Sequence, residues 1–109
     1  MTNKYKFFLT PLAVSDIDET LAYISGNLAN PVAASALLKQ IDETIDRIRL
    51  FPFANSDCSC FMIQDQNIRH VQIGNYVMIY EVDKEKSSIN ILRFRYSAMD
   101  LTSVELKNR

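Results

Sequence analysis

Residues 68–82 read IRHVQIGNYVMIYEV, two runs of β-branched and aromatic side chains on either side of Gly74-Asn75. A two-residue connection of this kind is typical of a tight β-hairpin turn. The pattern predicts strands over 68–73 and 76–82. A charged connection and a third run, residues 88–96, come next. We therefore expect a meander of three antiparallel strands, the last of which ends in Arg93-Phe94-Arg95-Tyr96.

Two helix starts precede this meander, and each is marked by a proline. In Thr10-Pro11 and Asn30-Pro31, a side chain that can cap a helix stands before a proline that suits the first helical position. Apolar residues then recur every three to five positions along both segments. The first stripe extends to Leu28, and Pro52 should end the second helix. The short connection between them predicts an antiparallel helical hairpin.

The outer segments complete an α+β domain. Residues 5–9 read as an N-terminal strand before the hairpin. Residues 54–67 read as a loop, in which 60–63 could add a short strand. Ser97 and Asp100 have the spacing of a capping box and could open a short C-terminal helix over 97–106. We expect one domain over residues 1–109, with the helical hairpin packed on an antiparallel sheet.

The composition fits a protein that folds without disulfides or a structural metal ion. Of its 109 residues, 48% are apolar, which is enough for one core. Cys58 and Cys60 are separated by one residue, a poor spacing for a disulfide, so we expect reduced thiols. There is no signal-like start and no apolar run long enough to span a membrane. We expect a cytoplasmic, unprocessed protein.

Charge is unevenly distributed along the chain. The net charge is −1. Residues 1–66 carry five basic and eight acidic side chains, whereas residues 67–109 carry seven and five. Any polyanion contact should therefore be sought in the C-terminal half. The only glycines are Gly26 and Gly74, and neither opens a helix after a strand, which excludes a phosphate-binding loop.

Three side chains near strand ends could carry chemistry: Arg69, Arg93 and Tyr96. A guanidinium suits phosphate or carboxylate, and a phenol can donate a hydrogen bond or transfer a proton. The structural alternative is that Tyr96 is half buried and that the arginines form ion pairs. The acidic candidates for those pairs are Glu81, Asp83 and Asp100.

A metal site is the weaker alternative. Cys58, Cys60 and His70 are the conceivable ligands, but their spacing matches no zinc pattern and a fourth ligand is missing. His70 is more readily explained as a structural histidine. We expect neither a metal nor another cofactor.

Several short motifs follow one another in a characteristic order over roughly residues 5–101. They are Leu9-Thr10-Pro11-x-Ala13-x-x-Asp16-Ile17, Asn30-Pro31-x-Ala33-Ala34, Phe51-Pro52, Ile68-Arg69-x-Val71-x-Ile73-Gly74-Asn75-Tyr76 and Arg93-x-x-Tyr96. Each motif is short, but their joint order and spacing are specific. The chain thereby resembles the RelE/ParE family, the toxins of bacterial type II toxin–antitoxin modules that stabilise plasmids.

The resemblance implies a β-α-α-β-β-β domain that arrests growth until a cognate antitoxin, commonly from the same operon, silences it. Operator DNA would be bound only through the antitoxin, and no membrane is involved. Some family members cut messenger RNA at the ribosome, by attack of the ribose 2'-hydroxyl on the adjacent phosphate. ParE-like members poison DNA gyrase instead.

For the nuclease branch, the resemblance assigns phosphate stabilisation to Arg69 and Arg93 and proton transfer to Tyr96. Nuclease members often carry basic residues before the position of Arg69, yet residues 50–68 contain no lysine or arginine. The sequence pI is near 5.7, whereas a basic surface favours RNA binding. We therefore expect a ParE-like gyrase poison. The alternatives are a RelE-like ribosome-dependent mRNA endoribonuclease and an inactive member that acts only as a binding partner.

Overall fold

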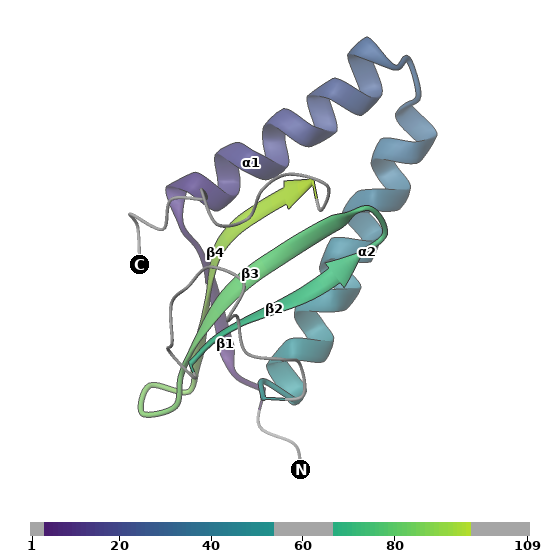
Figure 1. The fold of residues 1–109 in the computed structure, drawn as a ribbon. Coiled ribbons are helices and arrows are strands. Elements are labelled where there is room, and N and C mark those ends of the chain that lie inside the picture. Colours follow the sequence, from purple (N-terminus) through teal and green to yellow (C-terminus); the bar gives the residue numbers. More distant parts are fainter. Residues whose placement is uncertain (1–3, 54–66, 97–109) are drawn as a thin grey trace.

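The computed structural model describes residues 4–53 and 67–96. The short strand expected at 60–63 and the C-terminal helix expected at 97–106 lie outside the described residues. The elements, in chain order, are β1 (Lys6–Leu9), α1 (Pro11–Ala22), the π-helical turn η1 (Tyr23–Asn27), α2 (Pro31–Leu50), β2 (Ile68–Ile73), β3 (Tyr76–Asp83) and β4 (Ser88–Tyr96). The two helices form a hairpin on one side of the sheet (Figure 1). This is the α+β arrangement that the sequence predicts.

The sheet has the order β1-β4-β3-β2. Strands β2, β3 and β4 form the predicted antiparallel meander, and Ile73 faces Tyr76 across the turn. Gly74 has a φ of 58°, a conformation that glycine adopts without strain. The N-terminal strand β1 differs from the antiparallel expectation because it joins the sheet parallel to β4, with Phe7 beside Ile89. The whole sheet is therefore mixed.

Both helix starts are capped as predicted. The Thr10 Oγ1 atom accepts a hydrogen bond from the Ala13 N–H at 3.2 Å. The Asn30 Oδ1 atom accepts one from the Ala33 N–H at 3.0 Å. Helix α2 ends at Leu50, because the residue that follows precedes Pro52 and is disfavoured in a helical conformation.

The first helix is shorter than its apolar stripe suggests. Regular α-helix ends at Ala22, and the chain continues as a π-helical turn in which the Leu28 N–H donates to the Tyr23 carbonyl at 3.0 Å. Gly26 lies in this turn and is a poor helix former. Ala29 then takes a φ of 49°, which ends the helical path. The stripe is still continuous in space, since Ile24 is buried in the core.

The core lies between the helical hairpin and one face of the sheet. Its largest buried side chains are Tyr80 and Phe94, at 0% and 1% exposure. The Tyr80 hydroxyl donates to the Pro52 carbonyl at 3.4 Å. This contact links β3 to the residues that directly follow α2.

Candidate functional site

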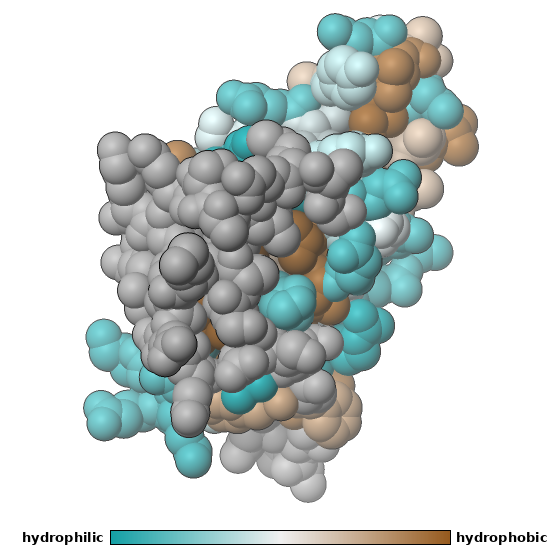
Figure 2. All heavy atoms as spheres, in the orientation of Figure 1, coloured by the Kyte–Doolittle hydropathy of each residue, from teal (hydrophilic) through white to brown (hydrophobic). Residues whose placement is uncertain are grey.

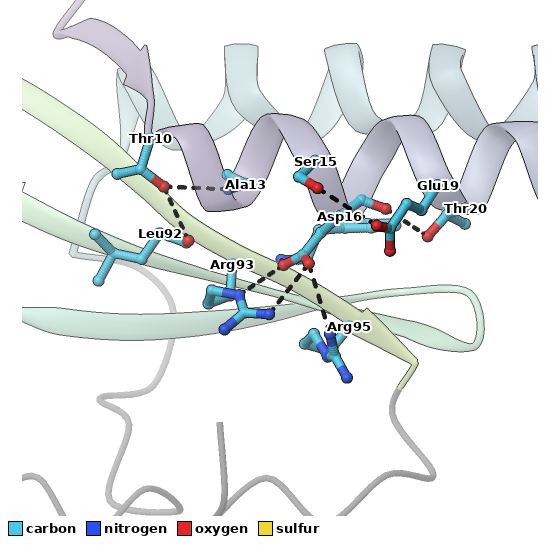
Figure 3. Close-up of polar contacts among 10 residues, drawn as sticks. Thr10, Ala13, Ser15, Asp16, Glu19, Thr20, Leu92, Arg93 and Arg95 are labelled. Carbon is cyan, nitrogen blue, oxygen red and sulfur yellow. Dashed lines mark hydrogen bonds and ion pairs between the residues drawn. The ribbon is translucent and has the colours of Figure 1, made fainter. Parts of the chain in front are cut away.

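Strand β1 covers only the first half of its neighbour β4, and the start of α1 covers the remainder. Pairing with β1 stops at Leu9, which lies beside Ile91. Beyond that point, the Thr10 N–H donates to the Ile91 carbonyl at 3.0 Å, and the Thr10 hydroxyl donates to the Leu92 carbonyl at 3.0 Å. Thr10 therefore marks the point where the neighbour of β4 changes from β1 to α1 (Figure 3).

Asp16, on the second turn of α1, continues this edge with a carboxylate. Its Oδ2 atom accepts hydrogen bonds from the Phe94 N–H at 3.1 Å and from Arg93 Nε at 2.7 Å. Its Oδ1 atom accepts from Arg93 Nη2 at 3.1 Å and lies 3.5 Å from Arg95 Nη1. Figure 3 shows the two guanidinium groups converging on this one carboxylate. The Asp16 side chain thus contacts both the backbone of β4 and two arginine side chains of that strand.

The pair between Asp16 and Arg93 is buried. The two residues are 7% and 8% exposed. Two guanidinium N–H groups of Arg93 meet the two oxygens of one carboxylate, which is the strong bidentate geometry. A guanidinium held in this way has its charge compensated within the fold, so its first role is structural. Arg95 is the more accessible of the two arginines, with 27% of its side chain exposed.

The position of Asp16 follows from helical spacing. Ala13 and Ile17 are both buried, and Asp16 lies on the same face of α1. The strand contributes an irregularity: Ile79 pairs with Arg93, whereas Tyr80 pairs with Ile91, which leaves Leu92 as an extra residue in β4. Such bulges commonly redirect side chains. Arg93 follows this bulge directly.

A cleft of about 620 Å³ lies beside the ion pair, between the end of the first helix and the ends of β3 and β4. Four aromatic side chains line it, and Asp16, Glu19 and Arg95 add charged groups. The rings of Tyr76 and Phe94 stack with centroids 5.1 Å apart, and Tyr96 meets Tyr76 edge-on at 5.6 Å. The helical side is formed by Tyr23 and Leu28 together with the polar residues Asp16, Glu19 and Thr20. The cleft could receive an apolar or aromatic side chain of a partner.

Arg69 lies elsewhere, near the start of β2. Its guanidinium carbon is 4.9 Å from the centroid of the Phe53 ring, and its Nη1 atom donates to the Phe53 carbonyl at 3.4 Å. Arg69 pairs with Tyr80, whereas Arg93 pairs with Ile79. Adjacent residues of a strand point to opposite faces, so the two arginines leave the sheet on opposite sides.

Tyr96 lies apart from Arg69, although it lines the same cleft as Asp16. It is 47% exposed and pairs with Tyr76, four residues along β3 from the partner of Arg69. Four residues of strand span about 13 Å. The structure therefore brings Arg93 together with Asp16 and places Arg69 apart from both this pair and Tyr96.

Sequence reasoning did not assign a role to Asp16. The sequence did contain a signal for this role, because Asp16 falls on the apolar face of the predicted first helix. A buried carboxylate needs a hydrogen-bonded or oppositely charged partner. The metal alternative remains a prediction: His70 is half-buried in β2, and Cys58 and Cys60 lie outside the described residues. Within residues 4–53 and 67–96, no three histidine, cysteine or acidic side chains are placed to hold a metal ion.

Solved structures from two toxin–antitoxin systems share this fold. A chain of the chromosomal ParDE toxin–antitoxin system from P. aeruginosa shares the fold with a TM-score of 0.66 at 15% identity, over 87% of this chain and 98% of that one. The toxin–antitoxin complex RelBE2 from Mycobacterium tuberculosis gives a TM-score of 0.54 at 17% identity, over 85% and 98%. Among functionally curated proteins, no sequence matches.

A family model described as the ParE toxin of the type II toxin–antitoxin system parDE matches residues 7–101. The chain therefore belongs to the ParE toxin family, within the RelE/ParE superfamily. In the part of the chain that the structure describes, no helix is long and apolar enough to cross a membrane.

Proposed function

We propose that this chain is a growth-arresting toxin that poisons DNA gyrase and is silenced by a cognate antitoxin. Membership of the ParE family supports the toxin class. The choice of a protein target over messenger RNA rests on one observation, the buried bidentate pair between Arg93 and Asp16.

That pair argues against phosphate chemistry at Arg93. A nuclease of the RelE type needs a guanidinium that donates to the oxygens on which charge builds. Both Nε and Nη2 of Arg93 donate to Asp16 instead, and 9% of the side chain is exposed. Presenting this arginine to a phosphate would take from the buried Asp16 carboxylate its main partner, a cost of several kcal/mol.

The positions of the other two residues point the same way. Arg69 leaves the sheet on the face opposite to Arg93, and it is stacked on Phe53. Tyr96 stands at the rim of the aromatic cleft. An internal transfer of phosphate needs its charge-stabilising and proton-transferring groups around one atom, within about 3 Å of the reacting groups. This arrangement supports a toxin that acts by binding a protein.

The antitoxin is the second part of the proposal. Both structural neighbours come from toxin–antitoxin systems. A groove between helical hairpin and sheet is the kind of site that takes the apolar side chains of an extended or helical segment. The aromatic cleft between Tyr23, Tyr76 and Tyr96 has this position. Tyr23→Glu should therefore weaken the complex with the product of the neighbouring small reading frame, measured by co-purification.

Induction of the chain in growing bacteria tests the choice of target. Plasmid topology and messenger RNA 5' ends are measured in the same cells after growth stops. We expect relaxed or cleaved plasmid and unchanged 5' ends. New 5' ends together with normally supercoiled plasmid would instead identify the endoribonuclease. Normal growth of cells that contain the intact chain and lack the antitoxin would identify an inactive member.

A further inference from the structure

A second feature lies far from the cleft, at the end of α2. We define the aromatic–basic surface by six residues that gather there: Phe7, Phe51, Phe53, Arg47, Arg49 and Arg69. Figure 2 shows hydrophobic atoms at this end of α2. The three phenylalanines are 39%, 61% and 40% exposed. So much exposed aromatic area in one place is characteristic of a binding surface.

The end of α2 and the residues after it contact both edge strands of the sheet, β1 on one side and β2 on the other. The Tyr5 N–H donates to the Arg49 carbonyl at 3.0 Å, and Arg49 Nε donates to the Tyr5 carbonyl at 2.6 Å. The start of β1 is thereby fixed to the end of α2. The guanidinium of Arg49 lies 5.2 Å from the centroid of Phe7, and that of Arg69 lies 4.9 Å from the centroid of Phe53. Two arginine–phenylalanine stacks result.

The surface itself is rich in arginine, although the net charge of the chain is −1. Three arginines belong to the surface, and Lys4 and Lys6 flank it on the adjoining strand. Asp46 contributes an opposing charge, 3.5 Å from Arg49 Nη1. Arginines in the last turn of α2 also interact favourably with the helix dipole. The dipole explains neither the position of Arg69 nor the exposed rings.

We propose that the aromatic–basic surface binds single-stranded nucleic acid. Flat exposed rings beside guanidinium planes are the combination on which unpaired bases stack, while the cations neutralise the phosphates. An acidic peptide would use the cations but would gain little from the flat rings. This binding is independent of the gyrase proposal and requires no cleavage. It also differs from the sequence-based expectation, because most of its cations come from the N-terminal half.

Fluorescence anisotropy of a labelled oligonucleotide of about 12 residues tests the proposal with the full chain, in RNA and DNA versions. We expect saturable binding by at least one of them, with affinity that falls as salt rises. Phe51→Ala should weaken binding about tenfold, because a stacked base is worth roughly 1–3 kcal/mol. Arg47→Gln should lower the slope of log affinity against log salt by about 0.7, the value for one phosphate on a single strand.

Matched controls lie outside this surface. Tyr23→Ala removes an aromatic side chain that is 53% exposed, and Lys39→Gln removes an exposed cation of α2. Both should leave the affinity unchanged. Absence of saturable binding, equal losses in Phe51→Ala and Tyr23→Ala, or a salt-dependent affinity that Phe51→Ala does not alter would each overturn the proposal. In the last case, complete displacement by polyglutamate would identify a surface for acidic peptides.

Discussion

A single carboxylate, that of Asp16, holds the end of β4 against α1. It accepts hydrogen bonds from the Phe94 backbone and from two nitrogen atoms of Arg93. Because carboxylate and guanidinium are both buried, each depends on the other to compensate its charge. The stability of the site should therefore respond strongly to the loss of one partner and weakly to the loss of both.

Arg93→Ala should lower the free energy of unfolding by about 3–5 kcal/mol, because it leaves the Asp16 carboxylate buried without its main partner. Urea denaturation of the purified chain measures this loss. Arg95→Ala is the control, since its ion pair with Asp16 is longer, at 3.5 Å, and more exposed. The control should lose no more than about 1 kcal/mol.

A double variant distinguishes pairing from simple packing. Asp16→Asn keeps an oxygen that can accept from the Phe94 N–H, and Arg93→Met keeps much of the buried apolar stem. Together they should lose at least about 1 kcal/mol less than the sum of the two single losses, because no charge remains unpaired. Additive losses would contradict the paired role of Asp16 and Arg93.

Tyr96→Phe separates binding from proton transfer. The substitution keeps the ring that meets Tyr76 edge-on and removes only the hydroxyl. We expect full growth arrest, measured by colony counts after induction at matched protein levels. Loss of arrest in a variant that unfolds at the wild-type urea concentration would show that the hydroxyl is needed, as in a nuclease.

At the scale of elements, local signals predicted most of the fold. Thr10, Asn30 and Pro52 marked the helix ends, and Gly74-Asn75 marked the turn of the β2–β3 hairpin. The parallel pairing of β1 with β4 was not predicted, because it joins residues about 80 positions apart and leaves no local pattern. The π-helical turn also escaped prediction, since Ile24 and Leu28 continue the apolar spacing of α1 through it.

The candidate site was less predictable than the fold, for the same reason. Arg93 is recognisable as a guanidinium at a strand end, but its partner lies 77 positions away. The bulge at Leu92, which sets the direction of Arg93, depends on strand register and not on local composition. A phosphate-binding arginine and an ion-paired arginine therefore look alike in the sequence.

Ala29, in the connection between the helices, tests the strain at the end of the hairpin. Its φ of 49° is costly for a residue with a Cβ atom. Ala29→Gly should raise the free energy of unfolding by about 0.5–1 kcal/mol. Ala36→Gly, the same substitution at an exposed position inside α2, should lower it by about 1 kcal/mol. Thermal unfolding of both variants would contradict this account if the two changes had the same sign.

The two helix caps should differ in importance. Asn30 caps α2 at an exposed position, so Asn30→Ala should lose about 1 kcal/mol. The buried Thr10 hydroxyl caps α1 and also donates to the Leu92 carbonyl. Thr10→Ala should lose roughly 2–3 kcal/mol, since a buried carbonyl is left without its donor. Equal losses in urea denaturation would show that α1 does not depend on Thr10 to join β4.

At the scale of the whole molecule, the two ends differ in chemistry. Between Glu19 and Lys39 the chain carries no charged side chain, and this segment forms the far end of the helical hairpin (Figure 1). The opposite end carries the aromatic–basic surface. The aromatic cleft lies between them. The two proposed binding surfaces, for a protein partner and for single-stranded nucleic acid, are therefore separate in the fold.

The most direct test of the proposed function is a supercoiling reaction with purified gyrase, relaxed plasmid and increasing amounts of the chain. We expect inhibition that grows with toxin concentration and disappears when the toxin is first mixed with its antitoxin. Tyr96→Phe should inhibit equally well. Full supercoiling activity at a large excess of folded toxin would contradict the proposal that this ParE family member poisons gyrase.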